Sequence, residues 1–121
     1  MALVIVAEEP EKFAKWKAHE GEGAPTPLTP QQARGQQVFL GAPCANCHNI
    51  TGIDASATLG PDLTHFRSRP TLAAGLLQNT RGNLAGWITN APAIKPGVQM
   101  PPNQISAVEL QDLLAYLDTL K

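Results

Sequence analysis

The chain has 121 residues, with nine Lys and Arg against ten Asp and Glu, and a net charge of −1. This length suits one domain with a short appendage, and the near-neutral charge offers no basic footprint for nucleic acid. No apolar run approaches the roughly 20 residues of a membrane span, and no secretory signal opens the chain. We therefore expect a domain detached from a longer protein whose targeting information lies upstream.

The start of the chain differs in pattern from the rest. Residues 2–6 are apolar and mostly β-branched, which predicts a short strand. Residues 8–19 are charged, and Phe13 and Trp16 stand three positions apart, which favours a turn or two of helix. Residues 20–30 are rich in Gly and Pro and have no periodicity, so we expect a linker there.

A compact domain is expected over residues 29–121, with residues 1–28 as the appendage. Its first helix begins at a capping box, the Thr-Pro-Gln-Gln run at residues 29–32. We expect this helix to run to about Leu40 and to stop at Gly41.

Both cysteines of the chain stand in one run, Cys-Ala-Asn-Cys-His at residues 44–48. A C-x-x-C-H run is typical of covalent haem attachment. On a helical turn Cys44, Cys47 and His48 share one face, so all three can point at one porphyrin. The thiols would add to the two vinyl groups, and His48 would bind the iron. The run predicts one covalently attached haem c.

Three other uses of the two cysteines fit the sequence less well. A redox dithiol belongs beside a βαβ pattern, which this sequence lacks. A structural zinc site needs four ligands, whereas His19 and His65 stand alone in the sequence. A disulfide would close a very small loop. These alternatives are weaker than haem attachment.

Short elements follow the haem motif. Residues 49–69 are expected to form a loop punctuated by Gly and Pro. Residues 71–78 and 84–89 are expected to form two short helices, with Asn83 as a cap for the second. Residues 91–104 hold four prolines, which predicts an extended loop.

The last helix opens at a second capping box, the Ser-Ala-Val-Glu run at residues 106–109. Five leucines then follow helical spacing: Leu110, Leu113, Leu114, Leu117 and Leu120. No segment after residue 30 alternates as a strand does. We therefore predict an all-α domain.

The second axial position of the iron separates a carrier from an enzyme. The candidates are His19, His65, Lys95, Met100 or no residue. Met100 stands beside prolines in a loop far from any helical stripe, an odd place for a core filler. With His48 and Met100 on the iron, the thioether raises the reduction potential and no position stays open for a substrate. The sequence thus predicts an electron carrier.

The chain resembles a class I cytochrome c, and more narrowly the cytochrome c domain at the C-terminus of subunit II in caa3-type cytochrome c oxidases. The resemblance covers about residues 3–121. It rests on Arg34-Gly35-x-x-Val38-Phe39, Ala42-Pro43-Cys44, Gly60-Pro61-Asp62-Leu63-Thr64-His65, Thr71-Leu72-Ala73-Ala74-Gly75, Trp87-Ile88, Lys95-Pro96-Gly97 and Met100-Pro101.

The resemblance implies a place for the appendage. In that family a cupredoxin domain with the dinuclear copper centre CuA comes first, and it ends in a strand and a stretch like residues 4–16. Residues 1–28 would then be the tail of that domain and a linker. The family's copper-binding cysteines are missing, because both cysteines here belong to the haem motif. The chain itself cannot bind CuA.

Several residue roles are implied by the resemblance. The Pro61 carbonyl would accept the Nδ1–H of His48. Trp87 would line the haem pocket near a propionate, with ordinary core packing as the alternative. Gly35 and Phe39 would lie where the first helix crosses the last, near Leu113, Tyr116 and Leu117.

For the basic residues and the two other histidines, the sequence leaves more than one role open. Four basic residues either pair with the propionates, ring the haem edge or are solvated surface charges: Arg67, Arg69, Arg81 and Lys95. We expect His65 at the surface or at the edge of a pocket, and His19 in solvent.

The implied function is electron transfer from a donor cytochrome or similar carrier to CuA of a terminal oxidase, in the periplasm or on the outer face of the bacterial membrane. The isolated domain would have no catalytic site of its own. The alternatives are a free-standing periplasmic cytochrome or dehydrogenase haem domain, a haem enzyme or gas sensor with an open iron position, and a zinc-binding interaction domain.

Overall fold

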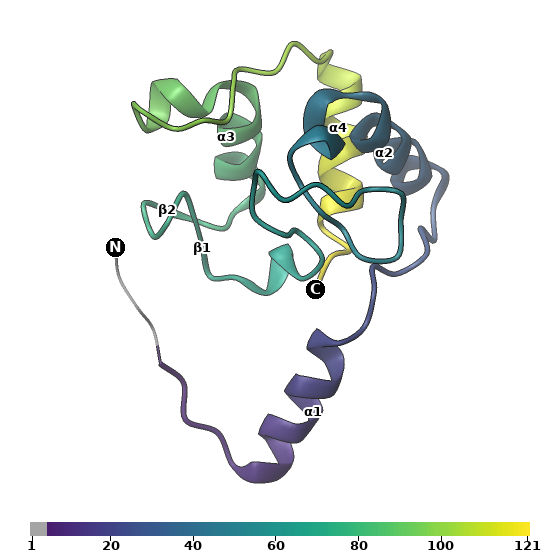
Figure 1. Cartoon of the computed structure of the whole chain (residues 1–121). Coiled ribbons are helices and arrows are strands. Elements are labelled where there is room, and N and C mark those ends of the chain that lie inside the picture. Colours follow the sequence, from purple (N-terminus) through teal and green to yellow (C-terminus); the bar gives the residue numbers. More distant parts are fainter. Residues whose placement is uncertain (1–4) are drawn as a thin grey trace.

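Helices account for nearly all the regular structure of the chain (Figure 1). The computed structural model describes residues 5–121. Its α-helices are α1 (Pro10–Glu20), α2 (Pro30–Gly41), α3 (Arg81–Ile94) and α4 (Ala107–Leu117). Two 3-10 turns, η1 (Pro43–Asn46) and η2 (Phe66–Ser68), and two short strands, β1 (Thr71–Leu72) and β2 (Leu77–Gln78), complete it. The all-α prediction is confirmed.

Two predicted capping boxes start the two helices that form the centre of the core. The Thr29 hydroxyl accepts the backbone N–H of Gln32, and the Gln32 side chain accepts the N–H of Thr29, at the start of α2. Ser106 and Glu109 make the same reciprocal pair at the start of α4. Each box satisfies N–H groups that lack partners in a first helical turn, which fixes where each helix begins.

Helices α2 and α4 pack against each other, as the resemblance implied (Figure 1). Gly35 permits this approach, because a Cβ at this position would overlap the backbone of Asp112 and lie 2.8 Å from the Cβ of Tyr116. Phe39 is buried one turn further along α2, and its ring centroid lies 6.5 Å from that of Tyr116. Arg34 adds an ion pair to Asp112 at 2.8 Å. The crossing therefore depends on a small residue and a bulky one on the same face.

The helix predicted over residues 71–78 is wrong. This segment is a hairpin, in which Thr71 pairs with Gln78 and Leu72 with Leu77. Three residues of its turn, Ala73, Ala74 and Gly75, have positive φ angles of 55°, 60° and 92°. Leucine and alanine have high helix propensity, which misled the prediction, but burial of Leu72 in the core decided the outcome.

Helix α3 is longer than predicted. It starts at Arg81, and its N-cap is Thr80, whose hydroxyl accepts the backbone N–H of Asn83. Asn83 is therefore inside the helix and not its cap. The helix also runs into the expected loop over 91–104, and has one non-helical residue, Asn90.

The appendage only partly follows the prediction. Residues 2–4 of the expected strand lie outside the described residues, and residues 5–9 have no regular structure. Helix α1 spans three turns, longer than expected, and projects from the rest of the molecule with no buried residue (Figure 1). None of the helices described is long and apolar enough to cross a membrane.

Candidate haem site

The C-x-x-C-H run forms a tight turn directly after α2. The backbone N–H groups of Cys47 and His48 both donate to the Cys44 carbonyl, at 3.1 and 2.9 Å. The two thiols are free and partly buried, so the structure has no disulfide between them. Burial raises the pKa of the Cys44 thiol. Two free thiols one helical turn apart are what attachment to two vinyl groups requires.

The His48 ring is held in one orientation. Its Nδ1–H donates to the Pro61 carbonyl at 2.7 Å. A carbonyl is only an acceptor, so Nδ1 carries the proton and Nε2 of the neutral ring keeps its lone pair. The resemblance implied this bond, and it presents Nε2 as a metal ligand.

Gly60 forms a cradle for the same ring. A Cβ at this position would lie 2.7 Å from both Cε1 and Nδ1 of His48, closer than real Cβ atoms come. The backbone N–H of Gly60 also donates to the Cys47 carbonyl at 2.6 Å. The sequence predicts only a turn residue at Gly60, whereas the structure requires a glycine there because the imidazole approaches so closely.

Hydrogen bonds within the loop stabilise the His48 segment, which we define as residues 43–64. Leu63 N–H donates to the Asn49 carbonyl at 2.9 Å, and Thr64 N–H donates to Asp62 Oδ1 at 2.7 Å. Asn49 donates its side-chain amide to the other Asp62 oxygen. Burial raises the pKa of Asp62, but the bonds from Thr64 and Asn49 and the charge of Arg69 lower it more, so it lies below its ordinary value.

The Met100 segment, defined as residues 95–105, connects α3 to α4. Met100 is partly buried. Lys95 ends α3 and donates its Nζ to the Ala73 carbonyl at 2.9 Å, which ties the segment to the hairpin. At the other end Asn103 donates to α3, a contact that the sequence analysis missed. Trp87 of α3 is partly buried and packs against the core.

All four basic residues proposed for the haem edge have partners within the protein. Arg67 and Arg81 pair with Asp118, at 3.0 and 2.5 Å. Arg69 donates to the Asp62 carbonyl at 2.6 Å, and Lys95 bonds Ala73 as described. These contacts therefore stabilise the C-terminal end of α4, the His48 segment and the Met100 segment.

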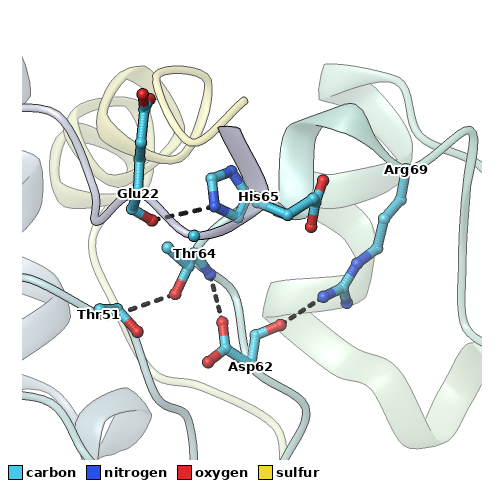
Figure 2. A pocket seen from close by; sticks show the side chains of 8 residues that line it. Glu22, Thr51, Asp62, Thr64, His65 and Arg69 are labelled. Atoms are coloured by element: carbon cyan, nitrogen blue, oxygen red, sulfur yellow. Dashed lines mark hydrogen bonds between the residues drawn. The ribbon is translucent and has the colours of Figure 1, made fainter. Parts of the chain in front are cut away.

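The two remaining histidines meet at the C-terminus. Their ring centroids lie 4.9 Å apart, and each ring bonds the Lys121 carbonyl at 2.8 Å. The other nitrogen of His65 contacts the Glu22 carbonyl, and His65 lines a shallow polar pocket with Thr51, Asp62 and Arg69 (Figure 2). The pocket-edge position of His65 was expected. His19 is exposed, as expected, and its Nδ1 also bonds the Glu22 carboxylate.

In the part of the chain that the structure describes, His, Cys, Asp and Glu side chains do not cluster into a metal site by themselves. Within residues 5–121, no group of three or more His, Cys, Asp and Glu could hold a metal ion. The zinc alternative therefore has no ligand set in this part of the chain, whereas the two thiols, the His48 lone pair and the Gly60 cradle fit a haem c.

Comparison with known proteins agrees with this site. The sequence profile of the cytochrome c family, described as "Cytochrome c", matches residues 32–121. The chain belongs to the cytochrome c family. The match starts within α2 and includes the haem motif, the hairpin and α4, so the fold is that of a cytochrome c domain, which carries electrons on a haem c.

Three curated relatives are each named cytochrome c oxidase subunit 2. The one from Alkalihalophilus pseudofirmus is 31% identical over 122 aligned positions, which cover the whole chain and 35% of the relative. Those from Bacillus sp. (strain PS3) and Bacillus subtilis are each 27% identical, over 92% of the chain and 32% of the relative. This cytochrome c domain spans about a third of the length of the relatives that it matches.

Proposed function

We propose that this cytochrome c carries one haem c, bound through thioethers to Cys44 and Cys47, with His48 and Met100 as the axial ligands of the iron. The observation that carries the proposal is the His48 ring, whose Nδ1–H is committed to the Pro61 carbonyl at 2.7 Å. That bond leaves Nε2, the other ring nitrogen, available as a metal ligand in the same turn as the two thiols. Met100 is the thioether available in a partly buried loop.

The bound haem would supply one-electron redox chemistry, and the residues of the chain would set its properties. The Pro61 bond fixes the tautomer and the orientation of the His48 ring. A Met100 thioether favours ferrous iron and raises the potential. Trp87, partly buried against the core, offers an aromatic wall to the pocket. Two protein ligands would leave no open position for a substrate, which supports a carrier over a haem enzyme or a gas sensor.

We propose further that the electron comes from a donor cytochrome or similar carrier and goes to CuA of a terminal cytochrome c oxidase. The support is the name shared by the three relatives and the resemblance over residues 3–121. Residues 1–28 would be the tail of the CuA domain and a linker, and the domain would work in the periplasm or on the outer face of the membrane. A free-standing cytochrome or a dehydrogenase haem domain is the second candidate.

Visible spectra of the haem-loaded protein test the axial ligands. The ferric wild type is expected to show the weak methionine–iron charge-transfer band, and the Met100→Ala variant is expected to lose it and to bind imidazole more tightly. Met1→Leu serves as the control, because it removes the other methionine of the chain. A wild type without the band would contradict Met100 as a ligand and favour an open iron position.

Stopped-flow mixing of the reduced protein with a CuA-containing oxidase subunit tests the acceptor. We expect rapid oxidation whose rate changes little with salt, because the net charge is only −1. Electron transfer no faster than to an unrelated copper protein would favour a free-standing cytochrome.

A further inference from the structure

Helix α3 has a kink at Asn90 and Pro92, where two backbone carbonyls lack their usual helical partners. Pro92 has no N–H, so the Ile88 carbonyl, four residues earlier, lacks its helical donor. The next carbonyl, that of Thr89, would normally accept from Ala93. Ala93 N–H instead contacts Asn90 Oδ1, at 3.3 Å, because Asn90 departs from helical geometry with φ −154° and ψ 73°.

Asn103 satisfies both of these carbonyls. Its side-chain Nδ2 donates to the Ile88 carbonyl at 2.9 Å, and its backbone N–H donates to the Thr89 carbonyl at 3.1 Å. Nδ2 also lies 3.3 Å from the Pro101 carbonyl. All the acceptors are carbonyls, so the orientation of the amide group is fixed by its bonding.

These contacts lie directly beside the proposed iron ligand. Asn103 follows Met100 by three residues, with Pro101 and Pro102 between them. The two prolines fix their φ angles, so the position of Asn103 is transmitted stiffly to Met100. The acceptors sit next to Trp87 on α3, and the Ile88 side chain is 5% exposed. A gap between helix and loop would therefore leave a polar group in the core without a partner.

We infer that Asn103 is a positioning residue for Met100: it fastens the Met100 segment to the kink of α3 and so keeps the thioether in place. The inference rests on the proposed function, in which Met100 binds the iron. The kink in α3 then contributes to the site, because it leaves the Ile88 and Thr89 carbonyls free to accept hydrogen bonds from Asn103. Without them the segment would be fastened mainly through Lys95, five residues before Met100.

Imidazole binding to the ferric, haem-loaded protein tests the inference, because imidazole enters only when the methionine leaves. The Asn103→Asp variant keeps the side-chain size but replaces the donor with a carboxylate that faces carbonyls. We expect imidazole affinity to rise about tenfold and the charge-transfer band to weaken. The matched control is Asn83→Asp, which removes an Nδ2 bond of the same length, 2.9 Å, from the other end of α3.

The control is expected to change imidazole affinity less than about twofold, even where its urea midpoint falls as far as that of Asn103→Asp. Equal imidazole affinities in the two variants would overturn the role of Asn103 but would leave the proposed Met100 ligation intact. A wild type that binds imidazole as tightly as Met100→Ala would overturn the proposed ligation, and the inference with it.

Amide hydrogen exchange in the haem-loaded wild type gives a second measurement, for the case that Asn103→Asp does not load haem. The backbone N–H of Asn103 donates to the Thr89 carbonyl and should exchange slowly. Its protection should fall when imidazole displaces the methionine. Exchange at the rate of an unprotected amide would overturn the inference.

Discussion

The two segments proposed to hold the iron are stabilised in different ways. The His48 segment makes most of its bonds to itself: Pro61 to His48, Gly60 to Cys47, and Leu63 to Asn49. The Met100 segment is fastened at its ends to other elements, through Lys95 and Asn103. A loop with its own network keeps its geometry when a neighbour moves, whereas a loop fastened at its ends follows the elements to which it is tied. The methionine side is therefore expected to open first.

Gly60→Ala is expected to have the largest effect, because it breaks the self-contained segment at its tightest point. The new Cβ would lie 2.7 Å from the His48 ring and would turn it away from the Pro61 carbonyl. We expect a loss of about 2 to 3 kcal/mol in unfolding free energy and poor haem incorporation, measured by urea titration and by the haem absorbance per protein.

Gly82→Ala provides the control for this prediction. A Cβ at Gly82 meets no atom within 4 Å, and this residue lies in the first turn of α3. Its unfolding free energy should rise by about 0.5 to 1 kcal/mol, because alanine favours a helix. Equal effects of the two changes would mean that the Gly60 cradle does not constrain the ring.

Pro92→Ala sharpens the comparison on the methionine side. An alanine N–H can bond the Ile88 carbonyl and compete with Asn103 for it. In a double-mutant cycle with Asn103→Ala, we expect a coupling energy of about 1 kcal/mol in unfolding free energy. Additive effects, measured by urea titration of the four proteins, would show that the two residues act independently.

Acid should weaken the His48 segment more than the Met100 segment. The folded pKa of Asp62 lies below its ordinary value, so its stabilisation is present above the unfolded pKa of about 3.9 and is lost as pH falls through the folded pKa. The Met100 segment contains no Asp, Glu or His side chain.

The Asp62→Asn variant tests this acid effect. Its stability deficit relative to the wild type should shrink between about pH 5 and pH 3, as measured by urea midpoints. Asp54→Asn, at an exposed position in the same segment, serves as the control. A deficit that stays constant with pH would contradict an ionised Asp62 as the source.

The smallest effect is expected where the appendage touches the C-terminal residue, through the bond between His19 and the Lys121 carbonyl. The bond to Glu22 and then the bond to the Lys121 carbonyl raise the pKa of His19. The stabilisation from a protonated His19 is thus present below the unfolded pKa of about 6.5 and is lost as pH rises through the folded pKa.

His19→Ala should therefore lower the urea midpoint slightly at pH 6 and hardly at all at pH 9, whereas the control Lys15→Ala should show no such pH dependence. A larger deficit at pH 9 than at pH 6 would contradict this sign. The visible absorption spectrum of the haem-loaded protein should stay unchanged in both variants, because the bond between His48 and Pro61 involves neither residue.

Structural features that depend on only a few neighbouring residues were predicted correctly. The two capping boxes, at Thr29 and Ser106, start helices where expected, because a cap bonds the backbone three residues away. Three of the five leucines with helical spacing face the core for a similar reason: Leu113, Leu114 and Leu117 are at most 4% exposed. Leu110 is only partly buried, and Leu120 is buried but follows the end of α4. The Cys44–His48 run likewise folds into a single turn, as expected, and its attachment to haem stays a prediction.

The sequence by itself determined the all-α class, the starts of α2 and α4 and membership of the cytochrome c family. Only the tertiary structure decided that residues 71–78 form a hairpin, that α3 continues past a proline, and that Gly60 touches the His48 ring. It also decided the partner of Asn103, which lies 15 residues away on α3. These features depend on atoms from distant residues meeting in the folded chain, and local propensity carries no information about such meetings.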